Sequence, residues 1–513
     1  MKLRIVTLMI LGLCFFNSAS AQHWCGTDHD KAFMDRAGEM TQYSNSNPLV
    51  RKVVDKRYVP LKFHLVADSQ GNGRIPESLV YTQVCRLNEQ YDSLGFVFYI
   101  DGGFNYPDNT VMYDHQTGAQ SQYAGARNQF PKSVNVFLVN EIRLNSQNPD
   151  DTGTAGYYSG GWDGLVVRKS NFDEDNNVTF GHELGHHFSL AHPHVGWEDD
   201  PYDPQVYGET VTVLTVGSVQ TGGGVPVELM NEVNCATAGD RICDTPPDYG
   251  FTQNAGATFT CHNPWEGIVK DRNGVLIVAI PNSVMGYNSC DIITFTHGQA
   301  NNMRSNYDTR VNQNVINSSY IPDTTEITES ISTIEPTAFS TVEFFNEVLF
   351  SWSPVEGAHG YKVVLSGTAE FEFETTEPEI VVNDLAPGAS YSWTVYPINE
   401  IGTCIDAPAT ILFFTSSDEV SSTNEIDLVT NLNVHPNPIV DQSFTISFES
   451  ESQLDASINV YDVSGKAIIR NLQQLIQQGN NSIPVQLNNA PVGLYNLIIN
   501  TSEGIISEKL IVK

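Results

Sequence analysis

Three histidines constrain this chain more than any other feature, because His186 lies four residues after His182 and His192 lies six residues after His186. Residues four apart lie on one face of an α-helix, so the first two imidazoles point toward the same place. Asn176 and Asn177 precede this stretch and can cap such a helix. We therefore expect a short helix, followed by a sharp turn that brings His192 back to the first two rings.

Three converging imidazoles are a typical ligand set for one catalytic zinc ion, which keeps a fourth position open. Glu183 follows the first histidine without being a ligand, so its carboxylate can accept a proton from water at the metal. Zinc lowers the pKa of such a water to about 7 and polarises a carbonyl group. The segment therefore predicts hydrolysis of peptide bonds, with Glu183 as the general base.

The stretch is similar to the metzincin pattern H-E-x-x-H-x-x-G-x-x-H, with Ser189 at the position of the glycine. A left-handed backbone costs a residue other than glycine roughly 1 to 2 kcal/mol, which a buried metal site offsets. His187 points to another side of the helix and His194 lies beyond the turn, so we expect both to be structural or solvated.

Residues 282–287, with the sequence Asn-Ser-Val-Met-Gly-Tyr, resemble the metzincin Met-turn. The resemblance implies that Met285 forms an apolar floor under the zinc ligands. It also implies that Tyr287 assists the oxyanion-like transition state. The alternative for Tyr287 is a core aromatic residue.

Several ordered motifs resemble the pappalysin family of metzincins, including the bacterial cytophagalysins. They are Ala155–Tyr157, Asp163–Val167, Gly239–Pro246 and Phe295–Arg304. The resemblance covers residues 56–320 and implies an α+β catalytic domain of two subdomains around a zinc cleft. Serralysins share some of these features but carry glycine-aspartate repeats, which are absent here.

The pappalysin resemblance also implies a structural calcium ion near residues 239–246. Its candidate ligands are Asp240, Asp244 and Thr245. The alternative is that Asp244 and Thr245 only cap a turn.

The chain has eight cysteines. We expect Cys14 to be removed with a signal peptide, which leaves an odd number and so at least one free thiol. The cluster that we expect to form two disulfides, in any of three pairings, is Cys235, Cys243, Cys261 and Cys290. Cys25, in Cys25-Gly26-Thr27, resembles the cysteine switch of latent metzincins, in which a thiolate occupies the open zinc position. The alternatives are a disulfide between Cys25 and Cys85 or a surplus cysteine.

The N-terminus reads as a secretory signal peptide over residues 1–21, with basic residues, an apolar run and Ala-Ser-Ala before Gln22. No later stretch approaches the ~18 apolar residues that span a bilayer, so we expect no transmembrane segment in the mature chain. Acidic residues outnumber basic ones by 60 to 26, for a net charge of -34, which argues against nucleic acid as a partner.

Composition divides the rest of the chain into four parts. We expect a prosegment at residues 22–56 and a mixed α and β catalytic domain at residues 57–320, with a helix near 76–94 and strands at 58–66, 134–139 and 164–167. After a polar linker, the strand and turn pattern of residues 334–416 resembles a fibronectin type III module and predicts an all-β sandwich.

A second linker precedes a strand-rich unit at residues 426–513, which also predicts an all-β sandwich. The unit resembles the C-terminal sorting domain of the type IX secretion system, and a generic adhesion sandwich is the alternative. The resemblance implies export through the periplasm, the secretion machinery as a partner, and a chain that is secreted or attached to the cell surface.

Two functional hypotheses follow from the sequence. The first is a secreted zinc-dependent endopeptidase that hydrolyses extracellular proteins or peptides. The second is a surface adhesion or binding protein that uses the metzincin domain only as a scaffold. The presence of every catalytic residue type at its position favours the endopeptidase.

Overall fold

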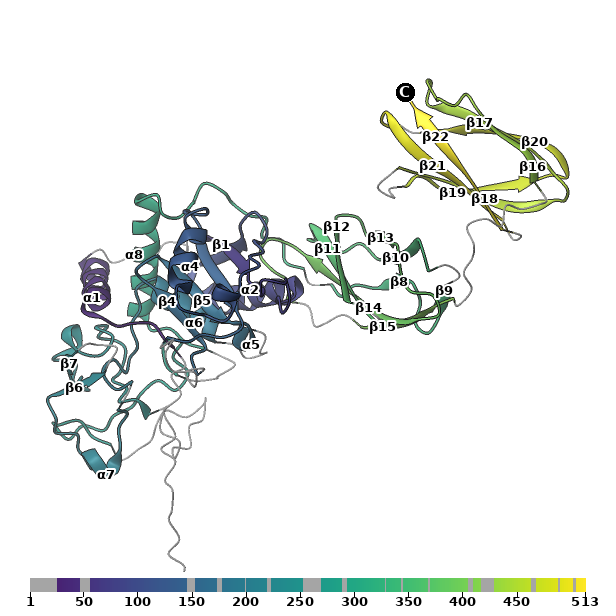
Figure 1. The fold of residues 1–513 in the computed structure, drawn as a ribbon. Helices are drawn as coiled ribbons and strands as arrows, with labels where there is room; N and C mark the ends of the chain where they lie inside the picture. Colours follow the sequence, from purple (N-terminus) through teal and green to yellow (C-terminus); the bar gives the residue numbers. More distant parts are fainter. Residues whose placement is uncertain are drawn as a thin grey trace, which may run out of the picture. The chain divides into compact units, whose positions relative to one another are not determined.

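The chain forms two compact units in a computed structural model (Figure 1). The first unit comprises Met1–Glu329, Glu356–His359 and Pro397–Asp406, and the second comprises the remainder. The structure describes residues 25–46, 56–144, 153–172, 178–198, 200–218, 223–251, 269–287, 293–327, 329–342, 345–367, 370–404, 409–416, 429–462, 467–487, 490–501 and 504–513. The predicted signal peptide, Asn176, Asn177, Cys261 and Cys290 lie outside these residues. Within them, none of the helices has the length and apolar character needed to cross a membrane.

The first unit is built on a five-stranded sheet in the order β2-β1-β3-β5-β4. Its strands are β1 (Arg57–Leu65), β2 (Phe96–Ile100), β3 (Val134–Val139), β4 (Gly156–Ser159) and β5 (Gly164–Arg168). Neighbouring strands are parallel except β4, which is antiparallel to β5 and forms the edge of the sheet. The strands predicted at 58–66, 134–139 and 164–167 are confirmed.

The helices of the first unit cover both faces of this sheet. They are α2 (Glu77–Tyr91) with the 3-10 turn η1 (Asp92–Leu94), α3 (Thr110–Tyr113), α4 (Ala119–Arg127), α5 (Lys169–Phe172), α6 (Thr179–His187) and α8 (His297–Asn312). Side chains alternate along β1 and β3, so α2, α6 and α8 share one core with one face of the sheet, while α3 and α4 pack on the other. The helix predicted near 76–94 is confirmed by α2 and η1.

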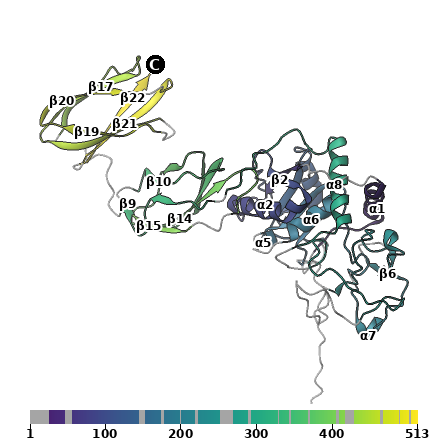
Figure 2. The same cartoon turned by 180° about the vertical axis from the view of Figure 1, so that it is seen from behind.

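Much of the described chain between α6 and α8 forms a lobe with little regular structure (Figures 1 and 2), while Ile242, Val284 and Met285 pack in the core of the sheet. Its elements are α7 (Pro204–Tyr207), β6 (Thr215–Ser218), β7 (Gly223–Pro226) and the 3-10 turn η2 (Cys235–Thr237). Aromatic side chains supply its core, in which Trp197 stacks on Tyr249 at a centroid distance of 4.9 Å. The chain then returns to the sheet through α8, whose N-terminus carries a capping box of Thr296 and Gln299.

The segment that we expected as a weakly patterned prosegment contains a helix, α1 (Lys31–Ser46), which lies beside α8 in both views (Figures 1 and 2). The hydroxyl of Ser44 donates to Asn302 at 2.6 Å, and the Asn302 amide donates to Thr41 at 2.7 Å. On the other side of α1, the guanidinium of Arg241 donates to the carbonyl of Met34 at 2.6 Å. Polar contacts therefore hold much of this helix, which explains its weak apolar pattern.

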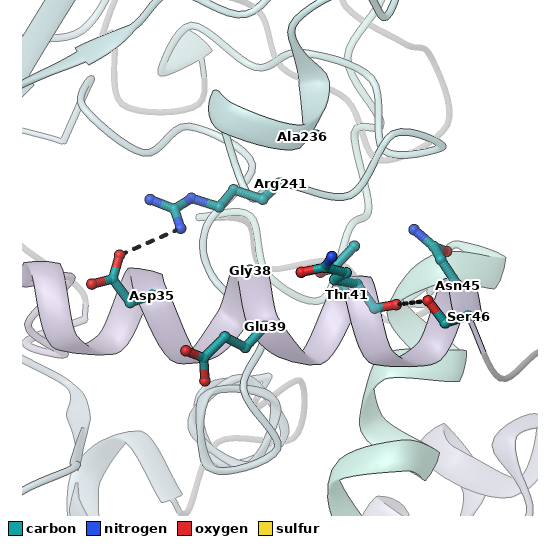
Figure 3. A pocket seen from close by; sticks show the side chains of 9 residues that line it. Asp35, Gly38, Glu39, Thr41, Asn45, Ser46, Ala236 and Arg241 are labelled. Carbon is teal, nitrogen blue, oxygen red and sulfur yellow. Dashed lines mark hydrogen bonds and ion pairs between the residues drawn. The ribbon is translucent and has the colours of Figure 1, made fainter.

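Figure 3 shows Arg241 reaching toward Asp35 across a groove between α1 and residues 236–241. The two charged groups are 3.9 Å apart, and the groove has a volume of about 630 Å³. The groove lies beside α1, so removal of the N-terminal segment would open it along its length.

Two disulfides are present among the described residues, Cys85–Cys404 and Cys235–Cys243. Cys25 is a free, buried thiol, so the alternative of a Cys25–Cys85 disulfide is wrong. The reason is that the loop around Cys404 belongs to the first unit and lies against α2, where Thr403 N donates to the carbonyl of Tyr81 at 3.0 Å. Cys235 and Cys243 pair with each other within the predicted cysteine cluster.

The second unit contains two all-β sandwiches, so the expected order of a mixed α and β part followed by sandwiches is confirmed. The first sandwich packs sheet β13-β10-β8 with sheet β12-β11-β14-β15-β9 around Trp352 and Trp393. Its strands are β8 (Thr333–Glu335), β9 (Thr341–Val342), β10 (Val348–Trp352), β11 (Gly360–Ser366), β12 (Glu370–Thr375), β13 (Glu379–Val382), β14 (Ser390–Ile398) and β15 (Ile411–Thr415).

The second sandwich has sheets β16-β17-β20 and β19-β18-β21-β22 around one apolar core. Its strands are β16 (Val429–His435), β17 (Ser443–Ser450), β18 (Leu454–Asp462), β19 (Ala467–Ile476), β20 (Gly479–Gln486), β21 (Gly493–Thr501) and β22 (Gly504–Val512).

Candidate metal centre

Helix α6 presents His182 and His186 on one face, one turn apart, and both side chains are buried. Their Nε2 atoms are 3.1 Å apart. The helix ends at His187, and the chain turns so that the Nε2 of His192 lies 3.1 Å from each of the other two Nε2 atoms. The structure thus brings together the three histidines that the spacing singled out.

Ser189 makes the turn that returns His192, with a left-handed φ of 69°. Leu190 N donates to the carbonyl of Gly185 at 2.9 Å, and the Asn306 amide of α8 donates to the Ser189 hydroxyl at 2.7 Å. A glycine would adopt this φ without strain. Serine adopts it here while its side chain is held by α8.

The protons on two of these rings can be assigned from their other nitrogens. His182 Nδ1 lies 2.8 Å from the carbonyl of Val284, and His186 Nδ1 lies 2.7 Å from the carbonyl of Leu190. A carbonyl only accepts, so each Nδ1 must carry the proton. The two Nε2 atoms then face each other with lone pairs, which is an arrangement that a cation stabilises.

The donor set fits zinc. Tetrahedral ligands about 2.05 Å from a zinc ion lie about 3.3 to 3.4 Å from one another, close to the spacing found here. Burial lowers the pKa of His182 to about 4 and also lowers the pKa values of His186 and His192, so the rings are in the neutral form that binds metal.

Cys25 supplies a fourth group at the same point. Its Sγ lies 3.3 Å from His186 Nε2, and the sulfur and one nitrogen of each of the three histidines all lie within 4.8 Å of one another. Burial and the nearby Glu183 carboxylate raise the pKa of the Cys25 thiol. A divalent cation at this point has the opposite effect, because a coordinated thiol is deprotonated.

Glu183 lies next to the histidines and is fully buried. Its Oε2 accepts a hydrogen bond from the hydroxyl of Thr27 at 2.9 Å, and the same hydroxyl accepts from Tyr158 N at 2.8 Å. Burial raises the pKa of Glu183 to about 8, and the bond from Thr27 opposes this rise. A carboxyl group with a pKa near neutrality is suited to both accepting and returning a proton.

The segment around Cys25 pairs with the edge strand of the sheet. Cys25 forms a parallel bridge to Gly156 of β4, and Gly26 N donates to the Gly156 carbonyl at 2.9 Å. The cavity that remains between Cys25, Glu183 and Tyr287 has a volume of about 10 Å³, room for about one water molecule. The N-terminal segment therefore fills the space beside Glu183.

Met285 and Tyr287 both lie next to the three histidines. Met285 is fully buried, and its sulfur lies against Gly185, the residue before His186 in α6. The ring of Tyr287 lies 4.9 Å from that of His192, and its hydroxyl donates to the carbonyl of Cys25 at 3.5 Å.

The predicted calcium ligands lie apart from the histidines. Asp244 accepts hydrogen bonds from Thr296 Oγ1 at 2.9 Å and from Gly298 N at 2.8 Å, at the start of α8. Asp240 is buried, accepts from Ile242 N at 2.8 Å, and has its pKa raised to about 8 by that burial. These contacts correspond to the alternative in which Asp244 stabilises a turn, and the calcium ion stays a prediction.

His187 and His194 are both buried and lie outside the ligand set. His187 Nδ1 is 3.5 Å from Asp163, a carboxylate that also binds Arg310. His194 stacks on His192 with a centroid distance of 4.6 Å. Both therefore have structural positions.

Sequence reasoning did not single out Thr27, His29 or Glu198, all buried at this centre. The ring of His29 lies 4.2 Å from that of His192. Glu198 Oε1 lies 3.6 Å from His192 Nδ1 and 4.0 Å from His29 Nδ1. Only Thr27 had a signal in the sequence, since it belongs to the Cys25-Gly26-Thr27 motif.

Comparisons with known proteins give one family. Residues 433–513 match the family described as the secretion system C-terminal sorting domain. The chain is therefore exported, and is secreted or attached to the cell surface. A comparison with curated proteins finds no match.

Solved structures give weaker similarities. A promirolysin mutant from Tannerella forsythia is 15% identical, with 57% of this chain and 96% of that chain covered and a TM-score of 0.35. The FN1–FN3 domains of chicken CNTN1 are 15% identical, covering 37% of this chain and 68% of that chain at a TM-score of 0.18. The fn3 domain of the human collagen alpha-1(XX) chain is 21% identical, with 20% of this chain and 95% of that chain covered and a TM-score of 0.15.

Proposed function

We propose that this chain is an exported zinc-dependent endopeptidase of the pappalysin-like metzincin type, held latent by its own N-terminal segment. The observation that carries the proposal is the convergence of three buried Nε2 atoms, each 3.1 Å from the others, beside the carboxylate of Glu183. His182, His186 and His192 would hold the zinc ion. Substrates would be extracellular proteins or peptides.

Zinc, when bound, supplies Lewis-acid polarisation of a peptide carbonyl and makes a nucleophile available from water at neutral pH. The chain's own groups do the rest. Glu183 takes the proton from the attacking water and returns it to the leaving amine. Tyr287 donates a hydrogen bond from its hydroxyl to the oxygen that becomes negative in the transition state.

Strand β4 would position the substrate. Its Gly156 already binds an extended segment of the chain through the backbone of Gly26, and this strand is an edge of the sheet. Edge strands readily accept another extended peptide. Release of residues 25–27 would therefore free both the metal centre and the binding edge.

Latency would depend on two side chains of the N-terminal segment. Cys25 would occupy the fourth metal position as a thiolate, and the hydroxyl of Thr27 would hold the Glu183 carboxylate. Together they would exclude the attacking water from its place and its base.

The proposal is tested with the Cys25→Ala chain, which opens the fourth metal position while keeping the full sequence. We expect this chain to bind one zinc ion and to cleave casein, gelatin or a peptide library. Adding Glu183→Ala should keep the zinc ion, measured by metal analysis, and lower kcat roughly 10²- to 10⁴-fold, the usual contribution of a general base.

A Cys25→Ala chain that holds one zinc ion and cleaves none of these substrates, before or after removal of residues 22–56, would contradict the endopeptidase. Binding to cell-surface or matrix proteins that survives Glu183→Ala, without turnover, would support the adhesion protein instead.

A further inference from the structure

The three histidines of the centre differ in what faces their Nδ1 atoms. His182 and His186 face backbone carbonyls at 2.8 and 2.7 Å. His192 Nδ1 is buried and faces the carboxylate of Glu198, with 3.6 Å between Nδ1 and Oε1. The third histidine alone among them therefore has an anionic neighbour, and that neighbour lies six residues further along the chain.

We propose that Glu198 is the positioning residue of His192: its carboxylate accepts the Nδ1 proton and thereby aims Nε2 at the metal. The inference rests on the proposed zinc site. A carboxylate behind a metal-binding histidine fixes its tautomer and its orientation and makes the imidazole a stronger ligand. Glu198 would act through His192 and would not touch the substrate.

The Glu198 side chain is fixed in position beside His192. Its Oε2 accepts a hydrogen bond from Gly196 N at 2.6 Å, and its side chain is fully buried. Gly196 has a φ of 94°, and a β-carbon there would stand 2.4 Å from Val225. The loop that carries Glu198 therefore requires glycine at position 196. Trp197 anchors the same loop by stacking on Tyr249.

The faces of the His192 ring are also occupied. His194 stacks on it at 4.6 Å with an interplanar angle of 10°, and His29 contacts it at 4.2 Å with an angle of 50°. These contacts define the ring position but offer no charge to the Nδ1 edge. Glu198 supplies that charge, so the orientation of the ring within this stack depends on it.

His29 gives the carboxylate a second neighbour, with its Nδ1 4.0 Å from Glu198 Oε1. His29, His192 and Glu198 have ligand atoms within 4.8 Å of one another, so the same three groups could instead hold a second metal ion. A neutral imidazole whose Nε2 already binds one metal keeps its proton on Nδ1, which favours the hydrogen bond over a second metal. The stoichiometry of binding distinguishes the two.

The experiment compares zinc affinity in the full-length chain and three variants, by competition with a chromogenic chelator. We expect Glu198→Ala to weaken zinc binding roughly 10- to 100-fold, and Glu198→Gln, which keeps an acceptor oxygen without the charge, to weaken it less. The visible spectrum of the cobalt-substituted protein reports ligand geometry, so it should change more in Glu198→Ala than in Glu198→Gln.

The matched control is Asp248→Asn. Asp248 is buried like Glu198 and its carboxylate lies 3.9 Å from Nδ1 of His194, a ring that is not a ligand. Its Oδ1 caps Gly250 N and Phe251 N, and asparagine keeps that oxygen. We expect this variant to bind zinc with wild-type affinity.

Glu198→Ala and Glu198→Gln chains with wild-type zinc affinity and cobalt spectrum would overturn the proposal. So would an equal loss in all three variants, which would show that any change in buried charge disturbs the lobe, and so would two zinc ions per wild-type chain. If the Glu198→Ala chain does not fold, the zinc affinity of the Glu198→Gln chain is compared with that of the Asp248→Asn chain, and this comparison decides. A wild-type chain without zinc affinity would instead overturn the proposed function, and this inference with it.

Discussion

Met285 places its sulfur against the backbone of Gly185, so close that a β-carbon on Gly185 would stand 2.3 Å from it. Gly185 lies between His182 and His186, so the sulfur supports α6 at the turn that carries both histidines. The contact explains why a residue of low helix propensity occurs in the middle of this short helix.

Gly185→Ala should therefore destabilise the protein despite alanine's higher helix propensity. We expect a loss of about 1 to 3 kcal/mol in the free energy of unfolding of the first unit, the usual cost of overpacking a core. Urea denaturation followed by tryptophan fluorescence measures it. The matched control is Gly125→Ala in α4, where nothing lies within 4 Å of the added β-carbon. That variant should gain about 0.5 to 1 kcal/mol, and equal effects in the two variants would contradict the Met285 contact.

Substitutions at Ser189 separate the energetic cost of its left-handed backbone from the stabilisation by its hydroxyl group. Ser189→Gly removes the strain of a φ of 69° and also the hydrogen bond from Asn306, so we expect a change within about 1 kcal/mol of zero. Ser189→Val adds a β-branched side chain in the left-handed region and should cost at least about 2 kcal/mol and weaken zinc binding. Thermal unfolding with and without zinc checks both, and a valine variant as stable as wild type would show that the turn has another conformation.

Thr27 and Cys25 should contribute separately to latency. Thr27→Val removes the hydrogen bond to Glu183 while keeping the shape of the side chain, and we expect the peptidase activity of the full-length chain to rise roughly tenfold. Cys25→Ala should raise it more, because it removes the ligand of the fourth position. Initial rates on a quenched peptide measure both. Thr27→Ser keeps the hydroxyl and serves as the control, which should stay as latent as wild type.

His64 should make stability depend on pH. Burial lowers its pKa from 6.5 to about 4, against the opposing effect of its bond to Asn135. Its Nε2 lies 2.9 Å from Asn135 Oδ1, and its Nδ1 lies 2.8 Å from the donor amide of Asn105, so the folded protein needs the neutral ring. The unfolded chain binds the proton more readily, so stability is full above about pH 6.5 and falls by about 3 kcal/mol toward pH 4.

Urea unfolding between pH 4 and 7 measures this slope, and His64→Gln supplies the comparison. Glutamine does not titrate, so the free energy of unfolding of the His64→Gln chain should depend less steeply on pH between 4 and 7. Identical slopes in the two proteins would show that other buried histidines account for the whole effect.

The convergence of His182, His186 and His192 was predictable because it depends on local spacing. The spacing of four residues from His182 to His186 determines a shared helix face, and the spacing of six residues from His186 to His192 leaves room for one tight turn. Strands β1, β3 and β5 were predictable for the same reason, since apolar and polar residues alternate along β1 and apolar residues dominate β3 and β5.

Long-range relationships were not predictable in this way. Glu198 reaches His192 through a loop held by Gly196 and Trp197, and no periodic pattern marks such a loop. The helix α1 was missed because much of its attachment is polar, through Thr41, Ser44 and the carbonyl of Met34. The pairing of Cys85 with a cysteine 319 residues later depends on where a distant loop lies, and spacing carries no information about that.

The Cys85–Cys404 bond closes a covalent ring of the polypeptide that includes the metal centre and nearly all of the first sandwich. One cut anywhere inside the ring leaves both fragments in a single molecule, and they separate only in the presence of a reductant. The strands of the sorting domain begin at Val429, outside the ring, so a cut after Cys404 detaches them at once. Proteolysis after Cys404 would thus remove the sorting domain from the chain, whereas single cuts between Cys85 and Cys404 would leave the fragments joined.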